Sequence, residues 1–260
     1  MTPDNVIAVG DGFHNLRGKL VVRGILPVGT QASLVRRKNG KYLLLDAIAL
    51  DDETRQWVLA QTDGGQAIDA VLHLHPFHTI FVKAFHEAFP GAKLYGTTRH
   101  HKRAPGLKWE ALRTDEAALH EMFADDLEFT VPRGVHLIPE NENLHFSSVL
   151  AFHPPSKTLH VDDTLNYVRL PLPFSLFKKD MLGFHPTLAR VLEERAGAAD
   201  EFREWAKDLV ERLRSVENLC AAHTTVLLAR HVDGPSIADR VAEALRGLEG
   251  KLAAHAARFG

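Results

Sequence analysis

A chain of 260 residues, 45% hydrophobic and 25% charged, has the composition of a folded globular protein and is long enough to bury a large core. Its formal net charge of -2 offers no electrostatic footprint for nucleic acid or an anionic membrane, and its single cysteine, Cys220, excludes an internal disulfide. Because the N-terminus lacks a signal-peptide pattern and no apolar run reaches roughly 20 residues, we expect a cytoplasmic protein without a membrane span.

The hydrophobic pattern predicts strands and helices that alternate along the chain. The predicted strands are 19–23, 32–36, 42–46, 67–75, 92–96, 135–139, 147–152, 158–161 and 220–228. The predicted helices are 51–62, 79–89, 116–123, 198–216 and 235–258. Asn39-Gly40 between two apolar runs is a strong hairpin signal. The alternation predicts one layered α/β or α+β domain over residues 1–260, with a helical insertion at about 170–217.

The segment His73-Leu74-His75-Pro76-Phe77-His78 carries the clearest chemical signal, in a chain that has 16 histidines. Residues two apart on a strand point to the same face, so we expect His73 and His75 to project together from the strand's C-terminal end. Pro76 ends the strand, and His78 would lie in the turn that follows. Imidazole is the commonest transition-metal ligand, and the segment therefore predicts a metal site at this edge of the sheet.

Three further candidate ligands lie beside or at the interruption of predicted strands. His145 comes just before the strand at 147–152, Asp163 just after the strand at 158–161, and His223 within the last predicted strand. Metal-ligating side chains commonly lie at such strand-to-loop junctions.

This order of residues resembles the metallo-β-lactamase superfamily, whose pattern is His-x-His-x-Asp-His after a buried strand, then a His, an Asp after a hairpin, and a His near the C-terminus. The resemblance covers roughly residues 5 to 235 and implies a four-layer αββα sandwich. It also implies that His73, His75 and His145 hold a first metal ion. His78, Asp163 and His223 would hold a second, with Asp163 bridging the two ions and taking part in catalysis.

Phe77 departs from the family pattern, because it stands where the motif has an aspartate that ligates the second metal. The second site would keep three candidate ligands, and the first site would keep three imidazoles with an open position, as in catalytic zinc sites. We therefore expect one or two ions, with zinc first and iron or manganese as alternatives. Asp46 and the neighbour of Asp163, Asp162, are expected to make supporting bonds rather than to bind metal.

The ligand set predicts a hydrolase, since a zinc-type ion lowers the pKa of its water from 15.7 to about 7 and no serine or cysteine nucleophile is then needed. The substrate would be a small-molecule ester, lactone, thioester or phosphoester. One alternative is a redox enzyme with non-haem iron at His73, His145 and Asp163. Another is a non-catalytic metal-binding or interaction protein, which Phe77 favours. A homodimer is expected only by analogy with the family.

Simpler interpretations stay open for several of these residues. His73 and His75 could be core histidines, and Asp163 could cap a turn. The basic cluster at 100–103 could be a solvated loop or could meet an anionic substrate group. The apolar first part of the insertion could be core, a lip over the metal site or a dimer contact.

Overall fold

The computed structural model describes residues 1–22, 26–170, 172, 180–223, 225–231 and 234–260. Its first sheet has the strand order β1-β2-β3-β4-β5-β6. These strands are β1 (Val6–Gly10), β2 (Phe13–Val22), β3 (Leu26–Arg36), β4 (Tyr42–Leu45), β5 (Ile68–Leu72) and β6 (Lys93–Tyr95). The pairs from β1 to β4 are antiparallel, whereas β4, β5 and β6 run parallel.

The second sheet has the order β13-β12-β9-β8-β7, in which β12 and β9 are parallel. Its strands are β7 (Glu128–Thr130), β8 (Leu150–His153), β9 (Thr158–Val161), β12 (Asn218–Ala221) and β13 (Val226–Leu227). A separate hairpin joins β10 (Leu165–Arg169) to β11 (Asp180–Phe184). The α-helices are α1 (Asp52–Gln61), α2 (Val82–Ala88), α3 (Thr98–Arg103), α4 (Ala117–Met122), α5 (Ala198–Leu213) and α6 (Ile237–Phe259).

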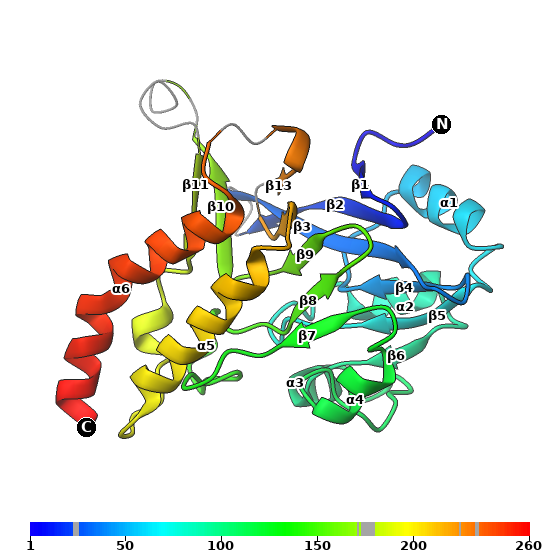
Figure 1. Ribbon diagram of the computed structural model, residues 1–260. Helices are drawn as coiled ribbons and strands as arrows, with labels where there is room; N and C mark the ends of the chain where they lie inside the picture. The colour runs from blue at the N-terminus through cyan, green and yellow to red at the C-terminus, as the bar shows by residue number, and fades with distance from the viewer. Residues whose placement is uncertain (23–25, 171, 173–179, 224, 232–233) are drawn as a thin grey trace.

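The four layers follow from strands that are apolar on both faces, as expected for sheets covered on both sides. On β4, Leu43 and Leu45 pack against the second sheet, while Leu44 faces the side covered by α1 and α2. On β8, Ala151 faces the first sheet and Phe152 faces α5 and α6. Figure 1 shows α5 and α6 together on one flank and α1 on the other. The predicted αββα sandwich is confirmed.

Most predicted elements are present with shifted ends. The Asn39-Gly40 hairpin joins β3 to β4, with Arg36 opposite Tyr42, and Gly40 has the positive φ of 85° that such a turn needs. At α1 the side chain of Asp51 accepts a hydrogen bond from the Thr54 amide at 2.7 Å, which caps the helix.

Three predictions of secondary structure were wrong. The strand predicted at 67–75 ends at Leu72, so neither His73 nor His75 lies on it. The segment 135–139 is not a strand and makes only an isolated bridge from Val135 to Leu192. The insertion at about 170–217 is not helical throughout: β11 and a short 3-10 helix at 188–190 precede α5, and residues 171 and 173–179 lie outside the described residues.

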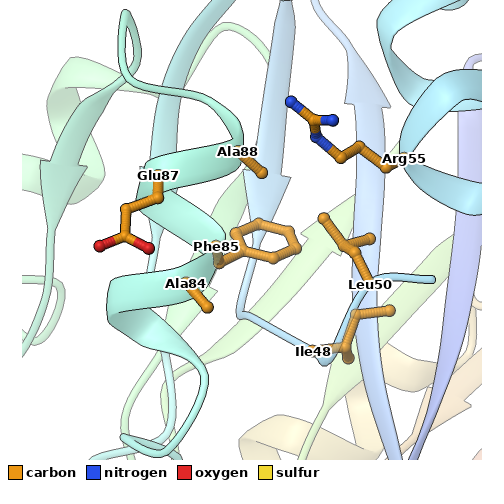
Figure 2. Close-up of a pocket in the computed structure, with 7 residues that line it drawn as sticks. All are labelled: Ile48, Leu50, Arg55, Ala84, Phe85, Glu87 and Ala88. Carbon is orange, nitrogen blue, oxygen red and sulfur yellow. The ribbon is translucent and has the colours of Figure 1, made fainter. Parts of the chain in front are cut away.

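None of the described helices is both long and apolar enough to cross a membrane. A pocket of about 260 Å³ lies between α2 and the segment after β4, lined by Ile48, Leu50, Arg55, Ala84, Phe85, Glu87 and Ala88 (Figure 2). Its lining holds one carboxylate and no histidine, so it offers no metal-binding donor set.

Candidate metal centre

The candidate ligands gather where parallel strands of both sheets end, the usual place for sites in α/β folds. Asp46 follows β4, and His75 follows β5 in the first sheet. Asp162 and Asp163 follow β9, and His223 follows β12 in the second sheet. The two sheets thus bring together residues that are far apart in the sequence.

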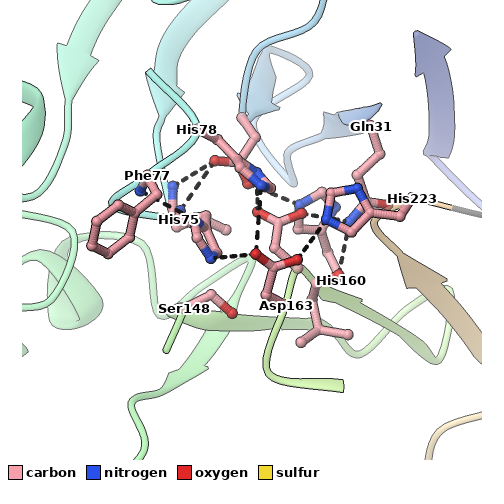
Figure 3. Close-up of polar contacts among 12 residues, drawn as sticks. Gln31, His75, Phe77, His78, Ser148, His160, Asp163 and His223 are labelled. Atoms are coloured by element: carbon pink, nitrogen blue, oxygen red, sulfur yellow. Dashed lines mark hydrogen bonds and ion pairs between the residues drawn. The ribbon is translucent and has the colours of Figure 1, made fainter. Parts of the chain in front are cut away.

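Asp163 is the centre of the group, and its side chain is 3% exposed. Its Oδ1 lies 2.6 Å from Nε2 of His223, and its Oδ2 lies 3.1 Å from Nε2 of His75 and 3.9 Å from Nε2 of His78 (Figure 3). The rings of His75 and His78 stack with their centroids 4.0 Å apart. We call these four residues the Asp163 cluster.

Two imidazoles of the cluster present the same side to Asp163. Nδ1 of His223 lies 2.9 Å from the Gly29 carbonyl oxygen, and Nδ1 of His78 lies 3.3 Å from Oδ2 of Asp162. Both oxygens can only accept, so Nδ1 of His223 donates its proton to Gly29, and Nδ1 of His78 carries the proton of an ion pair with Asp162. Each Nε2 therefore faces Asp163 either with a second proton or with a lone pair for a cation. This oxygen–histidine–cation order is the common supporting geometry of metal-bound histidines.

His75 is held in the opposite tautomer. Its Nδ1 accepts a hydrogen bond from the Phe77 amide at 3.1 Å, so its Nε2 carries the proton that faces Asp163. In this arrangement His75 fixes the orientation of the carboxylate. It can add a ligand only if it gives up the bond to Phe77.

The negative charges of the carboxylates in and beside the cluster are balanced by protons on its imidazoles. Burial disfavours the imidazolium of His78, but the charges of Asp162, Asp163 and Asp46 outweigh this and raise the pKa of His78 to about 9. Burial likewise disfavours the Asp163 carboxylate, yet the neighbouring His75 and His223 hold its pKa well below its usual range. The hydrogen bond to Asp163 raises the pKa of His223 against the effect of burial. The cluster thus favours positive charge next to Asp163.

A second buried group, Asp46, His160 and Asp162, lies directly behind this cluster. Oδ2 of Asp46 accepts from Nε2 of His160 at 3.0 Å, and Oδ1 accepts from the Leu74 amide at 2.7 Å. Burial and the charge of Asp162 raise the pKa of Asp46 to about 6. Asp46 therefore anchors the backbone that precedes His75, in keeping with the supporting role expected for it.

Either group could geometrically hold an ion, because three donor atoms lie within 4.8 Å of one another in His75, His78 and Asp163, and also in Asp46, His160 and Asp162. Most donor atoms of the second group already have protein partners, including Ser33 on Nδ1 of His160 at 2.9 Å and Gln31 on Oδ1 of Asp162 at 3.0 Å. Oδ2 of Asp162 makes no hydrogen bond and lies 3.3 Å from Nδ1 of His78. The Asp163 cluster is therefore the better candidate for a metal.

His73, predicted to point with His75, lies elsewhere. Its ring packs against His100 and Trp109, at centroid distances of 5.2 and 5.6 Å, and it belongs to neither described donor group. The two-residue alternation does not reach His75, because β5 has already ended at Leu72.

His145 lies beside the cluster with its ring turned away. Its Nε2 donates to the Glu142 carbonyl oxygen at 2.5 Å, and its ring stacks on Phe77 at 4.8 Å. The centroids of His145 and His75 are 6.4 Å apart. Phe77 therefore packs against both His75 and His145, and it lies at the edge of the group in Figure 3.

The sequence interpretation missed Gln31, Ser33, His160 and Gly29. A signal was present, since Gln31 and Ser33 are polar residues two apart on β3, and both are almost fully buried. Buried polar side chains of this kind require specific partners. Cys220 is fully buried, and burial raises the pKa of its thiol to about 12, so it offers no reactive thiolate.

No family model matches the sequence, and no curated protein matches it by sequence. Solved structures do match. The DIM-1 metallo-β-lactamase superposes with a TM-score of 0.58 and 16% identity, over 93% of this chain and 96% of its own. A metallo-β-lactamase from Erythrobacter litoralis gives 0.59 and 13%, over 95% and 99%. FIM-1 from Pseudomonas aeruginosa, in a mono-zinc form, gives 0.55 and 12%, over 95% and 96%. The chain therefore has the metallo-β-lactamase fold.

Proposed function

We propose that this protein is a metal-dependent hydrolase of small molecules, with a transition-metal ion held by His78, Asp163 and His223. The observation that supports it most directly is a pair of imidazoles whose Nε2 atoms both face Asp163, while Nδ1 of His223 is hydrogen-bonded to Gly29 and Nδ1 of His78 is paired with Asp162. The positions agree with the second metal site of the fold family, and His75 supplies an additional donor close to the same carboxylate.

Zinc is the ion we propose, since imidazole and carboxylate are usual zinc ligands and the similar FIM-1 structure is a mono-zinc form. Such an ion, when bound, supplies a water whose pKa lies near 7. The chain then has three tasks. His78 and His223 must be neutral at Nε2, Asp163 must keep its carboxylate ionised, as its lowered pKa favours, and the stacked Phe77 must exclude bulk water from one side.

Phe77 and His145 favour one ion rather than two. Phenylalanine removes one ligand of the second site, and the imidazole that would complete the first site donates its Nε2 proton to the Glu142 carbonyl oxygen. His73 is packed against His100 and Trp109, outside the donor set. We therefore propose one ion, on His78, Asp163 and His223, and a lactone, ester, thioester or phosphoester as substrate.

The decisive experiment is metal content per chain by plasma mass spectrometry, on protein purified without chelators. We expect about one equivalent of zinc in the wild type, and its loss in His78→Ala and His223→Ala. His153→Gln is the matched control, because His153 is buried and hydrogen-bonded to Ser156 at 2.7 Å outside the cluster. Turnover of an ester, lactone, thioester and phosphoester panel follows on the loaded protein. A chain that takes up no metal even after reconstitution would overturn the proposal.

A further inference from the structure

Two arginines of α3 converge on one carboxylate at the rim of the Asp163 cluster. Nη1 of Arg99 lies 2.6 Å from Oε1 of Glu142, and Nη2 of Arg103 lies 2.5 and 2.6 Å from its two carboxylate oxygens. Together the three side chains leave a net positive charge. The two guanidinium groups, Arg99 first, lower the pKa of Glu142, so its carboxylate is ionised at neutral pH.

The three side chains differ in how firmly they are placed. The Arg99 side chain is 14% exposed, and its guanidinium carbon lies over the Phe77 ring, 4.5 Å from the ring centroid. Its Nε is buried and makes no hydrogen bond. Glu142, by contrast, is 54% exposed and lies on the loop before β8. Arg99 is therefore the firmly placed member, whereas Arg103, 48% exposed, and Glu142 both lie at the surface, and the Glu142 carboxylate is the exchangeable partner.

This arginine pair lies next to the proposed metal ligands. Phe77, on which Arg99 packs, is 6.1 Å from His75 between ring centroids and belongs to the same turn as His78 (Figure 3). Guanidinium groups recognise carboxylate and phosphate oxygens through paired hydrogen bonds, and stacking on an aromatic ring holds them in position. The Glu142 carboxylate is 54% exposed, so another oxyanion can reach the same two guanidinium groups from solvent and compete with it.

We propose that Arg99 and Arg103 form the subsite for an oxyanion, a carboxylate or a phosphate, carried by the substrate, and that Glu142 fills this subsite in the free protein. The inference rests on the proposed function of the Asp163 cluster, and it narrows the substrate class to small anionic molecules. One small molecule would then span both places, with its anionic group at the two arginines and the bond to be hydrolysed between Phe77 and Asp163.

The test is calorimetric titration of inorganic phosphate and, separately, of succinate into the full chain. Each titration is done on the chain stripped of metal and again on the zinc-loaded chain. Removing the internal competitor in Glu142→Gln should tighten anion binding about five- to tenfold, because the subsite is then free. In the metal-free state, the double variant Arg99→Gln/Arg103→Gln should bind neither anion with a Kd below about 10 mM. Binding of phosphate alone would indicate phosphorylated substrates, and binding of succinate alone would indicate carboxylates.

Glu201→Gln is the matched control, since Glu201 is held by Arg195 at 2.5 and 2.7 Å on α5, outside the cluster. It should leave anion binding unchanged. The single variant Arg103→Gln, at a half-exposed position, covers the case in which the double variant fails to fold, and it should weaken binding severalfold. Equal affinities in wild type, Glu142→Gln and Arg103→Gln would overturn the inference. Zinc content measured on the same samples reports the proposed function separately.

Discussion

Two histidine-rich regions lie on either side of the end of β5, and they differ in their charged partners. The Asp163 cluster joins three imidazoles to a carboxylate, with Asp162 beside it. The other region, which we call the His73 group, consists of His73, His100 and Trp109. Within the described residues no ion pair links a carboxylate to either histidine of the His73 group.

The same side chain therefore has opposite properties in the two regions. Burial, with a smaller effect of His86, lowers the pKa of His73 to about 3, whereas the carboxylates around His78 raise its pKa to about 9. Both ring nitrogens of His73 are buried without a hydrogen-bond partner in the described structure. The comparison teaches that carboxylates, more than the number of histidines, determine where this protein can hold a cation.

The largest effect is expected from Asp163→Asn, which removes the charge from the cluster at almost constant volume. Without the carboxylate, His78 and His223 lose their common partner, and zinc affinity should fall on the order of 100-fold or more. Competition with a chelator of known affinity measures this. Asp69→Asn, at a half-buried aspartate paired with Arg37 and Lys41, is the control and should not change zinc affinity. An unchanged zinc affinity in Asp163→Asn would contradict the conclusion that carboxylates determine where this protein holds a cation.

An intermediate effect is expected from Asp46→Asn, because Asp46 acts through its neighbours. The amide would keep an acceptor for the Leu74 amide, but its NH₂ group would face the Nε2–H of His160. We expect zinc affinity to fall about 10- to 100-fold, with the fold retained. The same chelator competition, together with thermal unfolding of the metal-free chain, separates lost affinity from lost stability. If affinity stays at the wild-type value, Asp46 does not position the cluster.

The smallest effect on metal binding is expected from His73→Phe, which should retain zinc. It should also alter the pH dependence of unfolding. The folded state favours neutral His73, so its contribution to stability is complete above pH 6.5 and is lost as the pH falls from 6.5 toward 3.

For this reason, when the pH is lowered from 6.5 to 5, the free energy of unfolding of the wild type should fall by about 2 kcal/mol more than that of His73→Phe. Urea unfolding of the metal-free proteins at both pH values measures the difference. Loss of zinc in His73→Phe would contradict this prediction and would place His73 among the ligands, as the family resemblance implies.

The fold could be predicted from the sequence because its signals are local. The Asn39-Gly40 turn and the continuous apolar run of β4 each depend on neighbouring residues. Much of the candidate site could also be proposed, since His75, His78, Asp163 and His223 all lie in or just after strands that the pattern predicts.

The rest of the site depends on information that the sequence pattern does not contain. The apolar run through Leu74 gives no indication that β5 ends at Leu72, and this end decides the direction of His73. Asp46 has a φ of 58°, an unusual conformation for a non-glycine residue, and its bond to His160 spans 114 positions. Gln31 reaches Asp162 across 131 positions. Contacts of this range follow from the packing of the two sheets.

The bridge between Gly29 and His223 has a consequence for folding. The Gly29 amide donates to the His223 carbonyl oxygen at 3.0 Å, and a Cβ at position 29 would clash with that oxygen. The bridge closes a loop of 194 positions, and contacts across long loops form slowly, because the entropy of loop closure must be overcome first. We expect the donor set to be complete only when both sheets have assembled. Metal uptake would then distinguish fully folded chains from chains in which only the N-terminal sheet has formed.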